Sequence, residues 1–395
     1  MRKNLIGGIL LIVGTSVGGG MLALPMAVAT LSYDHSLLLF ISMWLLTLCG
    51  ALYLLEVNLW LPAGANLISM ARHTLGRPAE ALTWLAYLLL LYTLLSAYSA
   101  GGADLINQGL HYAGITVPTV MARSGFALIM AAILFFGVRA VDGVNRLLMF
   151  AKLFIFILLV VVLVPQVQAK HLMGYSPQIK PVLLVVVTAF GYGSIVPTLR
   201  SYFDSDVRSL RLAIVIGSMM PLLGYLAWNL AVKGTIGSEL LGQWQGHAQA
   251  VSHLTQSLSA IVDSAWFTTI AAVFTTLCIS TSFLGVGLGL TDFIADGLQV
   301  NKTGRSAWLV LVIAVAPPLC VVLFYPAVFI PALAFAGLCC VYLLLFLPAL
   351  MVTVGRYRQD RLRGHWQVWG GKPLAFLVLL LSAVLLVNAV WHLIN

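Results

Sequence analysis

The sequence predicts an all-α integral membrane protein, and three observations support this prediction. The chain has 395 residues, of which 61% are hydrophobic and only 8% are charged, whereas about a quarter of the residues in a soluble domain are charged. Its mean hydropathy is +1.02. Apolar runs long enough to cross a bilayer, about 20 residues each, recur along the whole chain. Most of this apolar surface must therefore face lipid.

Eleven apolar runs, separated by charged residues or by Pro and Gly, define the expected membrane spans. They cover residues 5–31, 36–61, 80–111, 124–138, 146–165, 181–199, 210–232, 265–296, 306–324, 327–353 and 373–393. Because the number of spans is odd, the two termini are expected on opposite sides of the membrane.

The Lys and Arg residues predict which side each terminus occupies. With a cytoplasmic N-terminus, the outer loops contain only Arg123, Lys170, Lys180 and Lys233, and the other 17 of the 21 cations, Lys152 within a span among them, are on the cytoplasmic side. Cytoplasmic loops are rich in Lys and Arg, so this orientation is the predicted one. The net charge of +9 then reflects membrane orientation, and no nucleic-acid partner is expected.

One outer connection, residues 233–263, is long enough to hold a helix of its own. In it Val251, Leu254 and Leu258 recur at helical spacing, which predicts an amphipathic helix. Such a helix could lie in the membrane interface or cover the outer end of the protein as a lid.

Two spans are interrupted by glycines at matching positions. The first contains the stretch GTSVGGGMLALP at 14–25, and the sixth contains AFGYGSIVP at 189–197. Span six comes five positions after span one, an odd offset, so the halves 1–165 and 181–353 run in opposite directions and 373–393 is left over. Interrupted segments at corresponding positions in two inverted halves indicate the central site of a transporter.

An interrupted helix would expose backbone groups that can bind a ligand. Free N–H and C=O groups cost several kcal/mol each in lipid, so a break survives where it lines a cavity. The N–H groups after Gly20 suit a carboxylate, and the carbonyls near Phe190 suit an ammonium group. The alternative is close helix packing, since Gly14 and Gly18 have the GxxxG spacing.

The stretch GTSVGGGMLALP closely resembles the span-one signature of the bacterial hydroxy and aromatic amino acid permeases, which include the tyrosine and tryptophan permeases. LLEVNL at 54–59 and VDGVNRLLMFAK at 141–152 are similar to that family too. This resemblance to a family of the amino acid-polyamine-organocation superfamily implies the leucine-transporter fold, a five-plus-five inverted repeat with an additional eleventh helix. It also implies proton-driven uptake of an aromatic amino acid across the bacterial inner membrane, and overall similarity favours tyrosine over tryptophan.

The expected substrate ligands surround both breaks, with two more on other spans. They are Gly14, Thr15, Ser16, Gly18, Gly19, Gly20, Phe190, Gly191, Tyr192, Gly193, Ser194, Tyr98 and Thr276. Aromatic rings among them could contact an aromatic ligand, which contributes about 0.5–1.5 kcal/mol beyond burial. Ordinary packing of aromatic side chains between membrane helices is the alternative.

Two ionisable residues within spans are candidates for proton coupling, because charge in the membrane is costly. The resemblance implies that Lys152 binds the carbonyls of the broken span one and the hydroxyls near 280–282. Snorkelling to the cytoplasmic surface is the alternative. Glu56 either carries the coupling proton or joins spans through hydrogen bonds. Asp104, Asp292 and Asp296 are expected at the membrane interfaces.

The sequence gives little support to an enzyme. It contains no H-E-x-x-H motif or P-loop, and its eight His residues are scattered through loops and span ends. No cofactor or metal is expected beyond the proton as coupling ion, although hydroxyls at 280–282 would suit sodium if Lys152 points elsewhere. The resemblance thus implies a proton symporter in the inner membrane, expected to act as a monomer; a carrier of other specificity or sodium coupling, or a channel, is the alternative.

Overall fold

The computed structural model describes the chain at residues 2–112, 114–136, 138–174, 182–204, 206–244, 247, 249–262, 264–301, 304–357 and 366–394. Within these ranges all regular structure is helical, which confirms the predicted all-α fold. Helices satisfy their backbone hydrogen bonds internally, as a segment within lipid must.

Each predicted span corresponds to a helix or a broken helix. In chain order these are α1 (Arg2–Ser16) with α2 (Gly19–Ala27), α3 (Tyr33–Leu59), α5 (Arg77–Tyr112), α6 (Thr119–Phe135), α7 (Val138–Leu163), α8 (Val182–Ala189) with η3 (Gly191–Ile195) and α9 (Val196–Tyr202), α10 (Val207–Ile236), α13 (Ala265–Gly297), α14 (Gly304–Phe324), α15 (Phe329–Cys340) with η5 (Val341–Phe346) and α16 (Leu347–Tyr357), and α17 (Gly371–Ile394). Among the described residues, nine helices are long and apolar enough to cross a membrane, or ten if the bent pair α1–α2 is one span.

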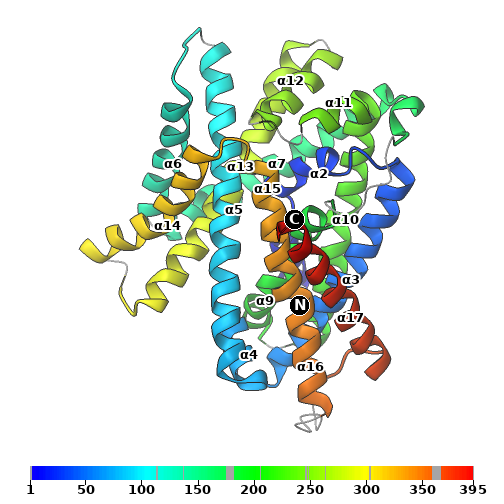
Figure 1. Cartoon of the computed structure of the whole chain (residues 1–395), viewed down its shortest axis with the longest axis vertical. Helices are drawn as coiled ribbons and strands as arrows, with labels where there is room; N and C mark the ends of the chain where they lie inside the picture. Colours follow the sequence, from blue (N-terminus) through cyan, green and yellow to red (C-terminus); the bar gives the residue numbers. More distant parts are fainter. Residues whose placement is uncertain are drawn as a thin grey trace.

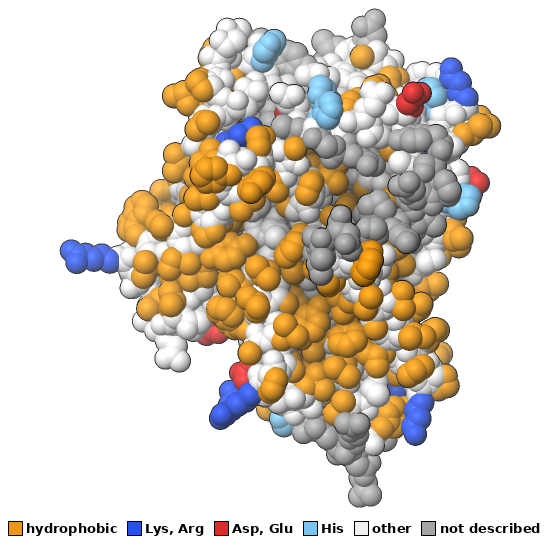
Figure 2. Space-filling view, in the orientation of Figure 1, with side chains coloured by type: hydrophobic (Ala, Val, Ile, Leu, Met, Phe, Trp, Pro, Cys, Tyr) orange, Lys and Arg blue, Asp and Glu red, His pale blue; other side chains and the backbone are white. Residues whose placement is uncertain are grey.

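Short helices close the two ends of the bundle. At the lower end in Figure 1 lies α4 (Leu67–Leu75), and α11 (Ser238–Gln243) and α12 (Ala250–Val262) lie at the upper end. Two further turns, η1 (Val164–Gln166) and η2 (Ala169–Leu172), follow α7. Hydrophobic side chains cover most of the middle of the face in Figure 2, and most of the charged side chains visible there stand toward its ends.

The predicted amphipathic helix is α12, and its apolar face packs on protein. Val251, Leu254 and Leu258 are buried, and α12 contacts α5, α10 and α13. An interfacial helix would bury this face in lipid instead. The observed packing makes α12 a cover over the upper end of the bundle.

The first break is shorter than the sequence suggested. Helix α1 continues through Gly14 to Ser16, α2 begins at Gly19, and only Val17 and Gly18 lie between them, with a bend of 54°. The N–H of Val17 still donates to the Val13 carbonyl at 2.8 Å. Each half-helix thus keeps its internal hydrogen bonds as far as possible, because unpaired backbone groups are costly inside the bundle.

The second break is a change of winding, not an unwound segment. Helix α8 ends at Ala189, Phe190 forms a turn, and Gly191–Ile195 continue as a tight 3-10 helix before α9. The expected release of a whole run of carbonyls is therefore corrected: 3-10 bonds satisfy most of this segment. Pro197 stands in the first turn of α9, where its missing N–H has no helical partner to lose.

Candidate functional site

The two breaks lie against each other inside the bundle. Helix α2 packs along α8, and a Cβ atom added to Gly20 would lie 3.8 Å from the Cα of Ala189. Glycine in span one thus faces the last residue before the turn in span six. Segments far apart in the sequence meet at one place, which the matching positions of the two interruptions predicted.

Glycines at the start of α2 let two other helices approach its backbone. The N–H of Gly19 donates to the Ser282 hydroxyl of α13 at 2.9 Å. A Cβ on Gly18 would lie 2.2 Å from that hydroxyl oxygen, and one on Gly19 would lie 2.6 Å from Cε1 of Tyr98 on α5. A side chain at either position would have to displace Ser282 or Tyr98. The N-terminus of α2 therefore presents bare backbone to Ser282 and to the ring of Tyr98.

Lys152 on α7 reaches the first break. Its ammonium group donates to the carbonyl of Val17 and lies 3.4 Å from the Thr281 hydroxyl on α13, and the residue is 2% exposed. The cation therefore compensates the negative C-terminal end of α1 and does not snorkel to a surface. Its placement is the one that the resemblance implied, between spans one, five and eight.

Tyr225 on α10 joins the two breaks, and sequence reasoning missed it. Its hydroxyl lies 2.7 Å from the carbonyl oxygens of both Ser16 and Ala189, the last residues of α1 and α8. Its ring meets the ring of Phe190 edge to face, with centroids 5.1 Å apart. A sequence signal existed: Tyr225, Asn229 and Lys233 recur every four residues, so one face of an apolar span carries polar groups.

Some predicted ligands contact a neighbouring helix or bond back within their own helix. A Cβ on Gly14 would lie 2.6 Å from the Met149 sulfur, so Gly14 allows close contact with α7. Thr15 bonds back to the carbonyls of Leu11 and Ile12. Thr276 is exposed and donates to a carbonyl within α13. The hydrogen bonds of Thr15 and Thr276 stay within their own helices and do not reach the second break.

Other predicted ligands line the second break. Gly191 lies near the Cys340 sulfur, 3.8 Å from where its Cβ would be, and Tyr192 is buried. Gly193 and Ser194 line a cavity of about 410 Å³ toward the lower end of the bundle. This cavity connects η3 to the surface between α4, α9 and α13.

The lower cavity is acidic and partly aromatic. Asp292 and Asp296 line it from α13, together with Tyr87, Phe293 and Asn66. The two aspartates were expected at the interface, and they lie near the end of their span. A charged solute leaving or entering along η3 would pass these carboxylates.

Glu56 forms a buried ion pair with a residue of another span. Its carboxylate accepts from Nε of Arg356 on α16 at 2.6 Å and from Nη2 of the same guanidinium, and the N–H of Val368 donates to it at 2.8 Å. Glu56 and Arg356 are both buried. The partner that the sequence left open is thus an arginine, and both carboxylate oxygens accept hydrogen bonds in this conformation.

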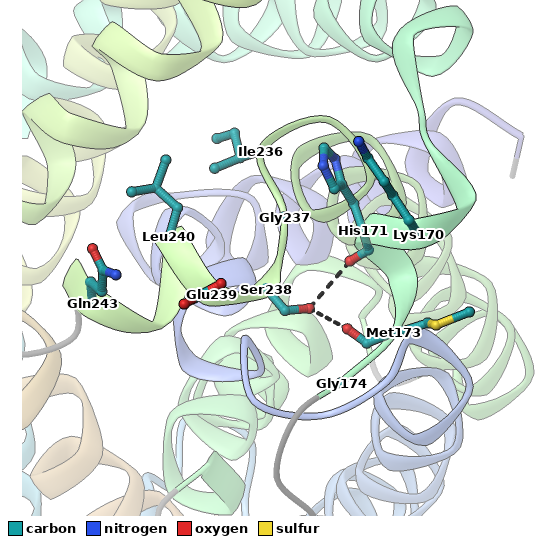
Figure 3. A pocket seen from close by; sticks show the side chains of 10 residues that line it. All are labelled: Lys170, His171, Met173, Gly174, Ile236, Gly237, Ser238, Glu239, Leu240 and Gln243. Atoms are coloured by element: carbon teal, nitrogen blue, oxygen red, sulfur yellow. Dashed lines mark hydrogen bonds between the residues drawn. The ribbon is translucent and has the colours of Figure 1, made fainter.

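The upper end of the bundle is held together by polar contacts. Asp104, expected at the interface, is buried and accepts from the N–H of Ser252 at 2.8 Å, which fixes the start of α12 to α5. Figure 3 shows a second cavity, about 570 Å³, between η2 and α11. There the Ser238 hydroxyl lies 3.2 Å and 2.6 Å from the carbonyls of His171 and Met173.

Comparison with known proteins finds similarity over the whole chain. The model of the tryptophan/tyrosine permease family matches residues 1–391. The "Tryptophan-specific transport protein" of Pseudomonas aeruginosa is 31% identical over 99% of this chain and 94% of its own length. The "Tyrosine-specific transport system 1" of Haemophilus influenzae is 31% identical over 98% and 96%, and the "Glutamine transporter 2" of Aliivibrio fischeri is 28% identical over 99% and 100%.

Solved structures similar to this one are transporters. Mhp1, a nucleobase-cation-symport-1 family transporter, superposes with a TM-score of 0.63 at 14% identity, over 97% of this chain and 88% of its own. A manganese transporter of Eremococcus coleocola gives a TM-score of 0.59 at 15% identity, over 99% and 86%. Both share the leucine-transporter fold, which confirms the fold that the resemblance implied.

Proposed function

Because this chain belongs to the tryptophan/tyrosine permease family, a family of transporters and not of enzymes, we propose that it imports an aromatic amino acid together with protons. We propose tyrosine as the preferred substrate over tryptophan. The observation that carries the proposal is the meeting of two interrupted spans around Gly18–Gly20 and Ala189, with the buried cation of Lys152 at the first break. A monomer in the bacterial inner membrane is the proposed transport unit.

The proposed substrate site is built from helix ends. The carboxylate would bind the N-terminus of α2, where Gly18 and Gly19 present bare backbone and Ser282 now occupies one N–H. An anion is favoured there by the helix dipole and the free N–H groups. The aromatic ring would lie among Tyr98, Phe190 and Tyr192. The names of relatives support an aromatic substrate, whereas the glutamine transporter among them supports a carrier of different specificity as the alternative.

Transport would proceed by alternating access. We propose that the halves 1–165 and 181–353 form two inverted repeats that move around the breaks, with 373–393 outside them. The predicted orientation places the lower end of the bundle in the cytoplasm and the C-terminus in the periplasm. The cavity of about 410 Å³ that contacts Gly193 and Ser194 then supports an inward-facing conformation.

Lys152 is the proposed coupling residue. Its ammonium donates to a carbonyl at the first break and lies beside a hydroxyl of α13. A sodium ion would compete with the ammonium for this position. Loss of the Lys152 proton would remove the positive charge that joins α1, α7 and α13. Deprotonation of Lys152 would thereby be coupled to the opening of the bundle. Sodium coupling remains the alternative if the lysine can be replaced without effect.

A competition panel tests the substrate. Purified protein in proteoliposomes should take up tyrosine in a saturable manner, and unlabelled tryptophan should compete more weakly than unlabelled tyrosine. Aliphatic and charged amino acids should leave uptake unchanged. Uptake that does not saturate would indicate a channel, and strong competition by glutamine would indicate the alternative specificity.

The coupling residue is tested by Lys152→Ala. Removing hydrogen bonds of a charged group costs about 1.5–3 kcal/mol, so accumulation driven by a pH gradient should fall by about tenfold or more. The matched control is Lys170→Ala, because Lys170 is exposed on η2 and should keep normal uptake. A Lys152→Ala protein that still accumulates substrate in response to the pH gradient would exclude the lysine from coupling.

A further inference from the structure

We propose that the hydroxyl of Tyr225 is a ligand of the substrate's ammonium group and makes the carrier select α-amino acids over acids that lack the amine. This inference rests on the proposed function and extends its site by a residue of span seven. Its basis is the position of the hydroxyl, 2.7 Å from the last carbonyl of α1 and 2.7 Å from the last carbonyl of α8.

The cluster around this hydroxyl has more acceptors than donors. A phenol has one O–H donor, so Tyr225 can serve only one of the two carbonyls, of Ser16 and Ala189, with a full hydrogen bond. The Ser16 hydroxyl, buried beside them, adds one O–H donor and one more acceptor oxygen, so two donors face four acceptor oxygens. Carbonyls at helix C-termini also have no partner within their helix. An ammonium group brings three N–H donors and no acceptor, which is what this cluster lacks.

The charge distribution supports a cationic ligand at the same place. Two neighbouring carbonyls at the end of α1 accept from different donors. The carbonyl of Val17 accepts from the ammonium of Lys152, whereas that of Ser16 accepts from the neutral hydroxyl of Tyr225. The C-terminal ends of α1 and α8 both carry negative partial charge. Lys152 compensates this charge at Val17, but among the described residues the carbonyls of Ser16 and Ala189 accept only from the neutral hydroxyl of Tyr225, which is fully buried away from solvent.

The geometry also fits a zwitterion whose carboxylate is at α2. Ser16 ends α1 and Gly19 begins α2, so the negative end of one half-helix and the positive end of the next face the same short break. An amino acid has its two charged groups on one carbon atom and can contact both ends at once. The edge-to-face contact with Phe190 holds the Tyr225 ring in this position.

The test is Tyr225→Phe, which removes the hydroxyl and keeps the ring against Phe190. Three competitors of labelled tyrosine uptake are compared: tyrosine itself, its amino alcohol without the carboxylate, and its deamino acid without the amine. A hydrogen bond to a charged group contributes about 1.5–3 kcal/mol, so both amine-bearing competitors should weaken about tenfold or more. The deamino acid should keep its wild-type potency.

The matched control is Tyr92→Phe on α5, which also removes one tyrosine hydrogen bond, a partly buried one to the Ile313 carbonyl at 2.8 Å, and should leave all three competitors unchanged. Equal weakening of every competitor by Tyr225→Phe, or none, would overturn the proposal. If the deamino acid does not compete even in the wild type, unchanged potency of the amino alcohol overturns it. Failure of the proposed function is distinct: wild-type protein would then transport no aromatic amino acid.

Discussion

At the scale of single residues, buried cations lie against the carbonyl ends of helices. Lys233 is fully buried and donates to the carbonyls of Ala29 and Leu31, just beyond α2. Arg200 donates to the carbonyls of Asn58 and Leu61 at the end of α3. The last carbonyls of a helix have no intrahelical partner, so each cation satisfies groups that would otherwise be unpaired. Lys152 belongs to the same pattern.

Glu56 and Arg356 provide a prediction at this scale. Glu56→Gln leaves a buried guanidinium without its counter-charge, and breaking a buried pair on one side costs about 3–5 kcal/mol. The protein should therefore melt at a clearly lower temperature in detergent. The double variant Glu56→Gln with Arg356→Gln should recover part of this loss, because no unpaired charge remains.

The same variant distinguishes the two roles that the sequence left open for Glu56. If the carboxylate only joins α3 to α16, the fraction of Glu56→Gln protein that folds should transport with the wild-type dependence on pH. A displaced pH profile in folded protein would instead assign the coupling proton to Glu56.

At the scale of elements, glycines decide how closely the helices approach one another. A Cβ on Gly50 of α3 would lie 2.0 Å from the carbonyl oxygen of Leu344 in η5, and one on Gly337 of α15 would lie 2.0 Å from that of Leu184 in α8. Backbone atoms cannot rotate out of the way as a side chain can. Span ten is a π-helix at this contact, a rare winding that is frequent at functional sites.

The contact at Gly50 predicts a loss of stability. Gly50→Ala must push α3 away from η5, and overpacking of this kind costs about 1–3 kcal/mol. Thermal unfolding in detergent should show a lower midpoint. Gly285→Ala on α13 is the control, because nothing lies within 4 Å of a Cβ there, and its midpoint should stay the same or rise. Equal midpoints for the two variants would contradict the close packing.

At the scale of the whole molecule, the two ends of the bundle differ. The upper end is covered by α12, whose start is fixed to α5 by Asp104, and its cavity lies beside η2 and α11 (Figure 3). The lower end has a cavity that contacts the second break. This asymmetry is what a carrier with one access path open at a time requires.

The asymmetry predicts the accessibility of two introduced cysteines. Thr198→Cys lines the lower cavity and Leu240→Cys lines the upper one. A membrane-impermeant thiol reagent should label Thr198→Cys only from the cytoplasmic side and Leu240→Cys only from the periplasmic side, with the unmodified chain as background. Tyrosine should slow the labelling of Thr198→Cys. Labelling with the two sides exchanged would contradict the predicted orientation, and labelling of both positions from one side would contradict the assignment of the two cavities to opposite ends.

The sequence by itself determined the helical membrane fold, the order of the spans and the place of both interruptions. These follow from local properties, because apolar length and glycine content act within one segment. The family was accessible too, through the stretch at 14–25. The length of each break was not accessible from the sequence, because the flanking helices wind as far as their neighbours allow. The close approach of Gly14 to Met149 likewise depends on how α1 and α7 pack.

Only the tertiary structure decided which groups meet. The pairing of Glu56 with Arg356 and the position of Tyr225 between Ser16 and Ala189 join residues of distant spans. No periodicity within one span specifies such a contact, because it depends on how helices pack side by side. The same reason explains why Lys233, which the sequence assigned to a loop, is fully buried: the carbonyls beyond α2 lie next to α10 only in the folded bundle.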